Sequence, residues 1–365
     1  MTATTERVAI IGTGLLGTSV ALAAARAGAS VTGWDVDHAV ASRAAELGAF
    51  PLAPSFEHAV ALASLVVIAT PIGSIPAVVA EALAVAPEAI VTDVGSVKTE
   101  LVRQVASLSE PRDLPRFVPG HPMGGSERSG PDHASASVVD GIVWAITPHP
   151  STDAAAVTRV ESFTAALGAR PVLLDPSRHD RLVAFVSHLP QVASTALMSL
   201  AETEEAGEPE ILLLAAGGFR DLTRLAASNP GLWSEILLAN REAIVTAIDL
   251  YAARLVRLRD EIAEARGADV EATFGSAKSA RLRLATKPTV RAGVAVLQIE
   301  VPDRPGALAH LTSVLGEGAV NIEDLQIVHS PEGGRGTVHL TVGSDAVVRA
   351  TAVLSAHGLD PTRLA

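Results

Sequence analysis

Three glycines near the N-terminus constrain the fold more than any other feature of this chain. Gly12, Gly14 and Gly17 follow the apolar run Arg7–Ile11 and precede an alanine-rich segment that ends at Ala27. In a strand–turn–helix unit, the first glycine of this spacing allows the tight turn. The second lets the backbone approach a pyrophosphate, and the third permits close packing of the helix. The pattern therefore predicts a dinucleotide-binding fold, with a tight structural turn as the alternative.

An acidic residue follows the second predicted strand, Ser30–Trp34, about 20 residues beyond the glycines. Asp35 at this position would hydrogen-bond a ribose 2′-hydroxyl and repel a 2′-phosphate, and the next arginine is Arg43. We therefore expect NAD rather than NADP, with a turn or cap aspartate as the alternative. The predicted cofactor site also includes Leu15, Leu16 and Thr70.

The order of predicted elements divides the chain into three domains. Short apolar runs alternate with helical patterns over residues 1–175, which predicts an α/β, doubly wound, Rossmann-like parallel sheet. Residues 176–285 are helical throughout and suit substrate binding and dimerisation. Residues 286–292 are a predicted linker, and residues 293–365 follow a β-α-β-β-α order typical of a ferredoxin-like domain. Beyond the first two, the predicted strands of the first domain are Ser64–Thr70, Ala89–Asp93, Gly141–Thr147 and Arg170–Leu174.

Composition excludes several classes of function. The 365 residues contain no cysteine, which rules out disulfides and cysteine metal sites, and we expect no metal. A net charge of -12 argues against nucleic acid as a partner. Leu182–Leu200 carries no charge and is long enough to span a bilayer, but its histidine, proline and hydroxyls favour a buried helix. With a polar N-terminus and no signal peptide, we expect a cytoplasmic enzyme without membrane contact.

One histidine stands in a glycine-rich segment beyond the predicted nucleotide-binding elements. His121 is the second residue of a run that begins at Gly120 and reads Gly-His-Pro-Met-Gly-Gly-Ser-Glu. This run predicts a rigid turn. A histidine accepts protons near neutral pH, as an alcohol requires when it loses a hydride. A capping or packing histidine is the alternative.

Three other residues suggest a chemical site. Ser96 follows a predicted strand at the carboxyl edge of the sheet, where ligands bind in such folds, although it could equally cap a helix. His188 lies in the uncharged helical stretch two residues before Pro190, and it could instead be a core residue. Arg224 could bind a carboxylate with two hydrogen bonds, or form an ion pair with Asp221.

Together these motifs resemble the prephenate/arogenate dehydrogenase family of tyrosine biosynthesis, over most of residues 8–284. The tail, from Val301 to Leu308 and around Asn321, resembles an ACT domain, a module that binds amino acids. The segments that carry the family resemblance are Gly12–Gly17, Asp93–Lys98, His121–Gly130, His188–Pro190, Phe219–Arg224 and Trp233.

The resemblance implies an NAD-dependent oxidative decarboxylation of prephenate to 4-hydroxyphenylpyruvate. His121 would accept the hydroxyl proton in its neutral form, and Ser96 would hydrogen-bond His121 or the same hydroxyl. Arg224 would bind a substrate carboxylate and His188 would line the pocket. Glu127 matches an acidic position of the family loop and would gate the site, or it is a solvated carboxylate. A homodimer through the helical domain is expected.

The ACT-like tail implies feedback, with tyrosine as the expected effector and a purely structural domain as the alternative. The predicted effector site consists of Asp303, Arg304, Gly306, Asn321 and Ile322.

Three rival functions stay open from the sequence. Arogenate dehydrogenase would need a carboxylate for the substrate ammonium. A reductase of the 6-phosphogluconate or 3-hydroxyacid type would use a lysine in the helical domain, where only Lys278 occurs. A non-catalytic regulator that senses NAD and amino acids would have no need of His121 and Ser96.

Overall fold

The computed structural model describes residues 6–124, 130–285, 294–329 and 335–364. Contacts divide the chain into two compact units, residues 1–198 with 225–252 and residues 199–224 with 253–365. The predicted linker, 286–292, and Glu127 lie outside the described residues.

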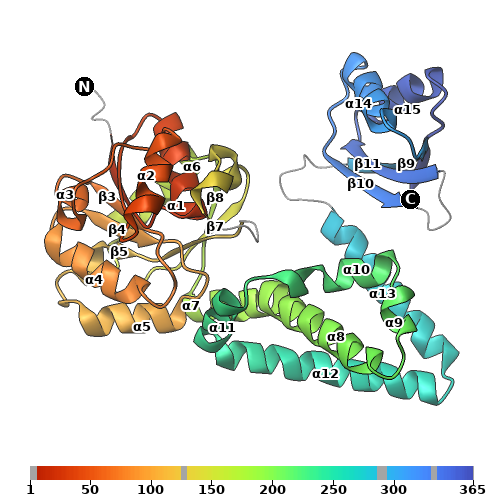
Figure 1. Ribbon diagram of the computed structural model, residues 1–365, viewed down its shortest axis with the longest axis horizontal. Coiled ribbons are helices and arrows are strands. Elements are labelled where there is room, and N and C mark those ends of the chain that lie inside the picture. Colours follow the sequence, from red (N-terminus) through yellow and green to blue (C-terminus); the bar gives the residue numbers. More distant parts are fainter. Residues whose placement is uncertain (1–5, 125–129, 286–293, 330–334, 365) are drawn as a thin grey trace. The chain divides into compact units, whose positions relative to one another are not determined.

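A five-stranded sheet forms the N-terminal part of the first unit (Figure 1). Its strands pair in parallel in the order β2-β1-β3-β4-β5, so the predicted parallel, Rossmann-like sheet is confirmed. The strands are β1 (Arg7–Ile11), β2 (Ser30–Trp34), β3 (Leu65–Ile68), β4 (Ile90–Asp93) and β5 (Phe117–Val118). The helices between them are α1 (Leu15–Arg26), α2 (His38–Glu46), α3 (Phe56–Val60), α4 (Ile75–Val85) and α5 (Thr99–Leu108).

A second, three-stranded sheet contains the segment around His121. Strand β6 (Gly120–Pro122) pairs antiparallel with β7 (Val143–Ile146), which pairs in parallel with β8 (Arg170–Leu173). Helix α6 (Ala154–Ala166) connects β7 to β8. The predicted turn at His121 is therefore wrong, because His121 pairs with Ala145 in the middle of a short strand. This strand has only three residues, and the glycine and proline at its two ends are residues that favour turns. The 3-10 turns of this part are Leu114–Arg116, Pro131–His133 and Ala136–Val139.

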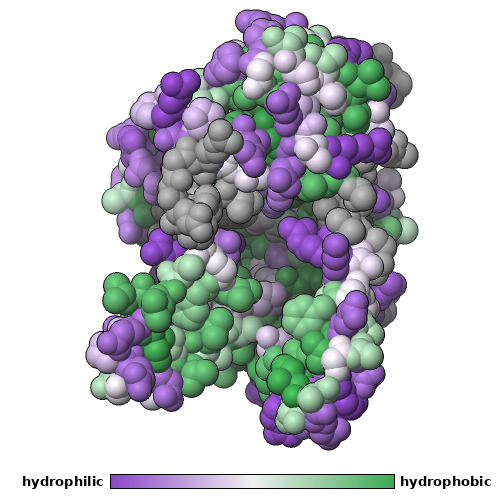
Figure 2. Space-filling view, turned by 90° about the vertical axis from the view of Figure 1, so that its right-hand side faces the viewer, coloured by the Kyte–Doolittle hydropathy of each residue, from purple (hydrophilic) through white to green (hydrophobic). Residues whose placement is uncertain are grey.

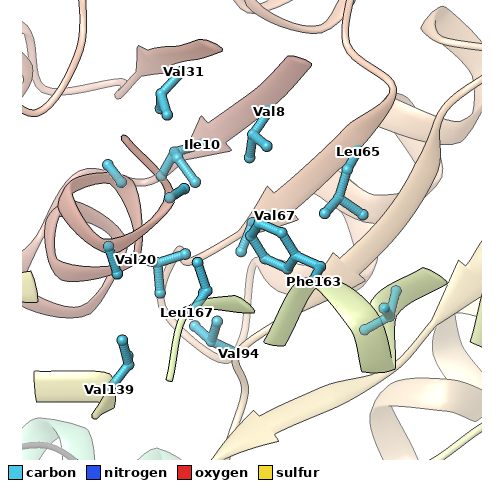
Figure 3. Close-up of a cluster of buried hydrophobic side chains, with 14 of the residues drawn as sticks. Val8, Ile10, Val20, Val31, Leu65, Val67, Val94, Val139, Phe163 and Leu167 are labelled. Carbon is cyan, nitrogen blue, oxygen red and sulfur yellow. The ribbon is translucent and has the colours of Figure 1, made fainter. Parts of the chain in front are cut away.

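The strands of the parallel sheet are buried on both faces. Along β1, Val8 and Ile10 join one apolar cluster, whereas Ala9 and Ile11 join another. This alternation follows from the two-residue period of a strand. Figure 3 shows the first cluster, in which Phe163 of α6 lies beside the sheet residues. Such a core fixes the strand ends that carry the site.

The helical region begins with one long helix, Pro176–Glu205, that contains a wider turn. The turn, η4 (Ala184–His188), has the π-helical pattern and joins α7 (Pro176–Val183) to α8 (Leu189–Glu205). Pro190 has no N–H to donate to the preceding turn, so regular α-helical bonding is interrupted here. The elements that follow are α9 (Glu210–Leu213), α10 (Gly217–Thr223), η5 (Arg224–Ala227), α11 (Pro230–Ala239), α12 (Arg241–Ala263) and α13 (Gly267–Ala285).

Many apolar side chains of these helices face outward. Leu213 is 81% exposed, Leu238 is 68% exposed and Leu250 is 62% exposed. Figure 2 shows apolar residues gathered in the lower part of the view, at the height of these helices in Figure 1. Among the described residues, Pro176–Glu205 is the one helix long and apolar enough to cross a membrane, and 33% of that apolar window is buried.

The C-terminal residues form an antiparallel sheet in the order β10-β11-β9-β12, with two helices. This confirms the ferredoxin-like prediction, and the structure adds a final strand that pairs with β9. Leu297, Ile299 and Leu340 are buried between sheet and helices. The elements are β9 (Val294–Pro302), α14 (Ala307–Glu317), β10 (Asp324–His329), β11 (Arg335–Gly343), α15 (Val347–Ala356) and β12 (Thr362–Leu364).

Candidate active site

The glycine turn after β1 has the geometry that a dinucleotide requires. Gly12 has φ +90°, and a Cβ there would lie 2.6 Å from the backbone of Ala69. A Cβ at Gly17 would lie 1.9 Å from the carbonyl oxygen of Gly12. Gly14 has open space within 4 Å of its Cβ position, and no described side chain caps α1. Open backbone at an uncapped helix start is suited to phosphate groups.

Asp35 lies at the end of β2, where it contacts the glycine turn. Its Oδ2 accepts a hydrogen bond from the Thr13 amide at 2.6 Å, and its Oδ1 accepts from the Asp37 amide at 2.9 Å. A carboxylate has further lone pairs on both oxygens, so these bonds leave acceptors for ribose hydroxyls. Thr70 follows β3, and its hydroxyl accepts a hydrogen bond from Ser74 at 3.0 Å. The residues present therefore fit a dinucleotide.

A buried ion pair supports the backbone next to His121. The Lys98 ammonium lies 2.5 Å from Oδ2 of Asp93 and donates to the Gly120 carbonyl at 2.7 Å. Asp93 Oδ1 accepts from the Gly120 amide at 3.2 Å. Lys98 and Asp93 are both fully buried. Burial lowers the pKa of Lys98, while the nearby Asp93 opposes that shift. Both polar groups of Gly120 are thus held by one ion pair, which fixes the start of β6.

His121 belongs to a chain of two imidazoles and a carboxylate. Its Nδ1 lies 2.9 Å from Nε2 of His179, and Nδ1 of His179 lies 2.8 Å from Oδ1 of Asp180. The two rings meet edge to face, with centroids 5.1 Å apart. Asp180 also accepts hydrogen bonds from the amides of Lys98 and Thr99, at 2.9 and 2.7 Å. His179 and Asp180 are buried, whereas His121 retains partial exposure.

A second histidine, His188, is held by Asn240. The Asn240 amide nitrogen donates to the backbone carbonyl of Asp180 at 2.9 Å and lies 3.2 Å from Nδ1 of His188. Because that carbonyl can only accept, the facing amide atom is nitrogen, so His188 Nδ1 is the acceptor. The other nitrogen of His188 then carries the proton and is a donor. The ring also packs edge to face with Trp233, at a centroid distance of 5.9 Å.

Both His121 and His188 are uncharged at neutral pH. Burial lowers the pKa of His121 well below its ordinary value, and the neighbouring His179, Lys98 and His188 lower it further. Burial also lowers the pKa of His188 to about 4, with Asp180 opposing that shift. A neutral imidazole can accept a proton, as a general base must.

The other predicted site residues are placed as follows. Ser96 lies between β4 and α5, two residues before Lys98, and is half-buried. Among the described residues, His121 bonds to His179, and the predicted hydrogen bond between Ser96 and His121 is not formed. Arg224 is the first residue of η5 and lies in a stretch assigned to the second unit. Its predicted contact with a substrate stays a prediction.

The predicted effector residues surround the start of α14 and the entry to β10. Gly306 has φ +88°, a left-handed conformation that favours glycine, and directly precedes α14. Asn321 donates from its amide to Glu323 Oε1 at 2.9 Å, and Ile322 packs against the local core. Asp303 and Arg304 are exposed in the turn after β9.

Sequence reasoning gave no role to several residues of this site, including His179, Asp180, Lys98, Asp93 and Asn240. The pair His179-Asp180 stands between two arginines on a polar segment, a pattern typical of a solvated helix face. Lys98 could have been found from the sequence, because it lies in the segment Asp93–Lys98, which carries the family resemblance and follows a buried strand.

A dinucleotide cradle at the carboxyl edge of a parallel sheet, close to a neutral histidine, defines a nucleotide-dependent dehydrogenase. Comparison with family models makes this specific. Residues 20–173 match the prephenate dehydrogenase nucleotide-binding domain, residues 175–276 match the prephenate dehydrogenase dimerization domain, and residues 295–359 match the ACT domain. The chain belongs to the prephenate dehydrogenase family and carries a C-terminal ACT domain.

Individual relatives agree with this assignment. The chain is 31% identical to a prephenate dehydrogenase of Bacillus subtilis over 93% of each protein. It is 33% identical to a cyclohexadienyl dehydrogenase of Zymomonas mobilis, over 78% of this chain and 98% of that one. A prephenate dehydrogenase structure from Aquifex aeolicus, in complex with hydroxyphenyl propionate and NAD+, superimposes with a TM-score of 0.72 at 27% identity, covering 78% of this chain and 100% of that one. An arogenate dehydrogenase from Synechocystis gives a TM-score of 0.68 at 27% identity, covering 76% and 99%.

Proposed function

We propose that this chain is an NAD-dependent prephenate dehydrogenase that converts prephenate to 4-hydroxyphenylpyruvate and carbon dioxide. One observation carries the proposal: His121 is a neutral, partly exposed imidazole whose Nδ1 is already bonded to His179. Within the part of the chain that the structure describes, its other nitrogen, Nε2, has no hydrogen-bond partner, so it is open to a substrate hydroxyl. The family membership supports the substrate class, and the glycine turn with Asp35 supports NAD rather than NADP.

The residues of the chain have distinct roles in this reaction. The glycine turn and Asp35 would hold NAD+, which would supply the acceptor for the hydride that leaves C4 of the substrate. His121 takes the C4 hydroxyl proton as the carbonyl forms, and the ring then loses carbon dioxide and becomes aromatic. His121 can return the same proton to the resulting phenolate oxygen, so the protons balance over one turnover. Ser96 donates to the reacting oxygen. His188, as a neutral donor, and Arg224 bind polar groups of the substrate.

Steady-state assays with prephenate and arogenate, each with NAD+ and NADP+, test this function. We expect the highest kcat/KM with prephenate and NAD+. A higher kcat/KM with arogenate would identify an arogenate dehydrogenase, and no turnover with either would favour a non-catalytic sensor.

We further propose that two copies associate through the helical region. The exposed apolar residues Phe185, Leu238 and Leu250 border a hollow of about 980 Å³ that polar residues of α5, α7 and α12 also line. Covering such a patch with a second copy removes apolar surface from water, as the matched dimerization domain suggests. Sedimentation of the full chain and of Leu250→Glu tests this, with a shift toward monomer expected in the variant.

The remaining parts of the proposal concern regulation and organisation. The ACT domain would bind tyrosine at Gly306 and Asn321 and inhibit the enzyme, which would act in the cytoplasm. The functional division stays as proposed from the sequence, at residues 1–175, 176–285 and 293–365. In the full chain, Asn321→Ala should weaken tyrosine inhibition without changing kcat in the absence of tyrosine.

A further inference from the structure

We propose that His179 and Asp180 are positioning residues that select the reactive form of His121 and share the proton it gains. The inference rests on the proposed function, in which His121 is the base. The geometric basis is the unbroken chain of hydrogen bonds from His121 Nδ1 through both nitrogens of His179 to Asp180.

The direction of this chain follows from the carboxylate. Burial alone would favour protonated Asp180, but hydrogen bonds from His179 and from the amides of Thr99 and Lys98 hold the pKa of Asp180 below its ordinary value. The ionised carboxylate can only accept, so Nδ1 of His179 carries a proton. In our proposal this is the single proton on His179, which leaves the other nitrogen, Nε2, bare. That nitrogen accepts from Nδ1–H of His121.

This order leaves a bare Nε2 on His121, which is the state a general base needs. The opposite tautomer would have its proton on Nε2 and could not accept one there. When Nε2 of His121 takes the substrate proton, the proton on Nδ1 can transfer along the hydrogen bond to Nε2 of His179, and these two bonded nitrogens are 2.9 Å apart. The positive charge then lies beside the Asp180 carboxylate. The reverse shift restores His121 when the proton returns to the product.

The pair is held rigidly by several elements. Asp180 on α7 accepts from the first residues of α5, and its backbone carbonyl accepts from Asn240 just before α12. The charged or titratable groups that face His121 are His179 on α7, Lys98 before α5 and His188 in η4. Because Asp180 also caps α5, removing it would disturb folding, so His179 is the better residue to change.

Nitrogen-15 NMR of histidine-labelled enzyme tests the tautomer without any substrate. We expect a proton on Nδ1 of His121 in the wild type, with the resonance assigned by its loss in His121→Asn. His179→Phe removes the acceptor, so His121 should shift to the Nε2–H form. A wild-type His121 that carries its proton on Nε2 would overturn the proposal, whatever the activity of the enzyme.

Kinetics separate the two parts of the proposal. His179→Phe should lower kcat by about 10²–10⁴-fold, the contribution of a positioned base, with little change in NAD+ affinity. His179→Gln offers an acceptor but cannot take the proton, so its kcat should lie between those of the wild type and His179→Phe. His149→Gln, a histidine in the same unit that accepts a hydrogen bond from the Ser151 amide, is the control and should match the wild type.

Failure of this inference differs from failure of the proposed function. If wild-type enzyme does not turn over prephenate but NMR places the proton on Nδ1, only the substrate assignment is wrong. If prephenate is turned over and His179→Phe is folded with unchanged kcat, the positioning role is wrong. Should His179→Phe fail to fold, the wild-type tautomer and the kcat of His179→Gln decide the question.

Discussion

The sheet and the helices hold the two sides of the candidate site by different means. On the sheet side, the buried ion pair of Lys98 and Asp93 hydrogen-bonds the carbonyl and the amide of Gly120. The position of the next residue, His121, therefore follows from main-chain geometry. On the helical side, side chains bond to one another, from His179 to Asp180 and from Asn240 to His188. The sheet therefore fixes where the proposed base lies, and in our proposal the helices determine which of its nitrogens is protonated. Substitutions on the two sides should fail in different ways.

The largest effect is expected at the residue where the two sides meet. His121→Asn removes the base, so kcat should fall by about 10²–10⁴-fold while NAD+ affinity stays close to wild type. Stopped-flow turnover and NAD+ titration by fluorescence measure the two quantities. Turnover near the wild-type rate would exclude His121 as the base.

Next in size is the sheet-side support. Lys98→Met leaves the Asp93 charge buried without its partner, which should cost about 3–5 kcal/mol in the free energy of unfolding. Denaturant unfolding measures this cost. The double variant Lys98→Met with Asp93→Asn should recover part of the loss, because the uncompensated charge is removed. A single variant within about 1 kcal/mol of wild type would show that the ion pair does not stabilise this part of the sheet.

On the helical side we expect an effect on binding. Arg224→Ala should remove a charged hydrogen bond to a substrate carboxylate, raising KM by about 10–100-fold with little change in kcat. Initial rates over a range of prephenate concentrations separate the two parameters, with Arg220→Ala as a nearby control. A change confined to kcat would contradict a binding role.

The smallest effect concerns pH. The pKa of His188 is about 4 in the folded chain, against an ordinary value of 6.5, so the unfolded chain takes up a proton first as pH falls. Stability is therefore fully present above pH 6.5 and is lost progressively toward pH 4. At pH 5 this loss should be about 2 kcal/mol. Unfolding at pH 7.5 and pH 5 should show a smaller acid loss in His188→Asn than in the wild type; equal losses would exclude this source.

Much of this could be predicted from sequence because it depends on local pattern. The glycine spacing at Gly12–Gly17 and the apolar run Arg7–Ile11 determine a strand, a turn and a helix that adjoin one another in the chain. The pairing of His121 with His179 joins residues 58 positions apart, and it depends on how α7 packs against β6. Secondary-structure propensity depends on residues that are near in the chain, so it does not predict such packing. Glycine and proline around His121 likewise favour a turn, yet pairing with β7 makes the segment a strand.

The wide turn at Ala184–His188 has a consequence for the two helical histidines. In an uninterrupted α-helix each residue advances by about 100°, so His179 and His188, nine residues apart, would point in opposite directions. The π-helical hydrogen bonds span five residues rather than four, so the chain rotates less per residue there. The smaller rotation brings the directions of the two imidazoles nearer to one another, and His179 contacts His121 directly. One added residue in a single turn thus changes the helical phase between two histidines that one continuous helix carries, each with partners of its own.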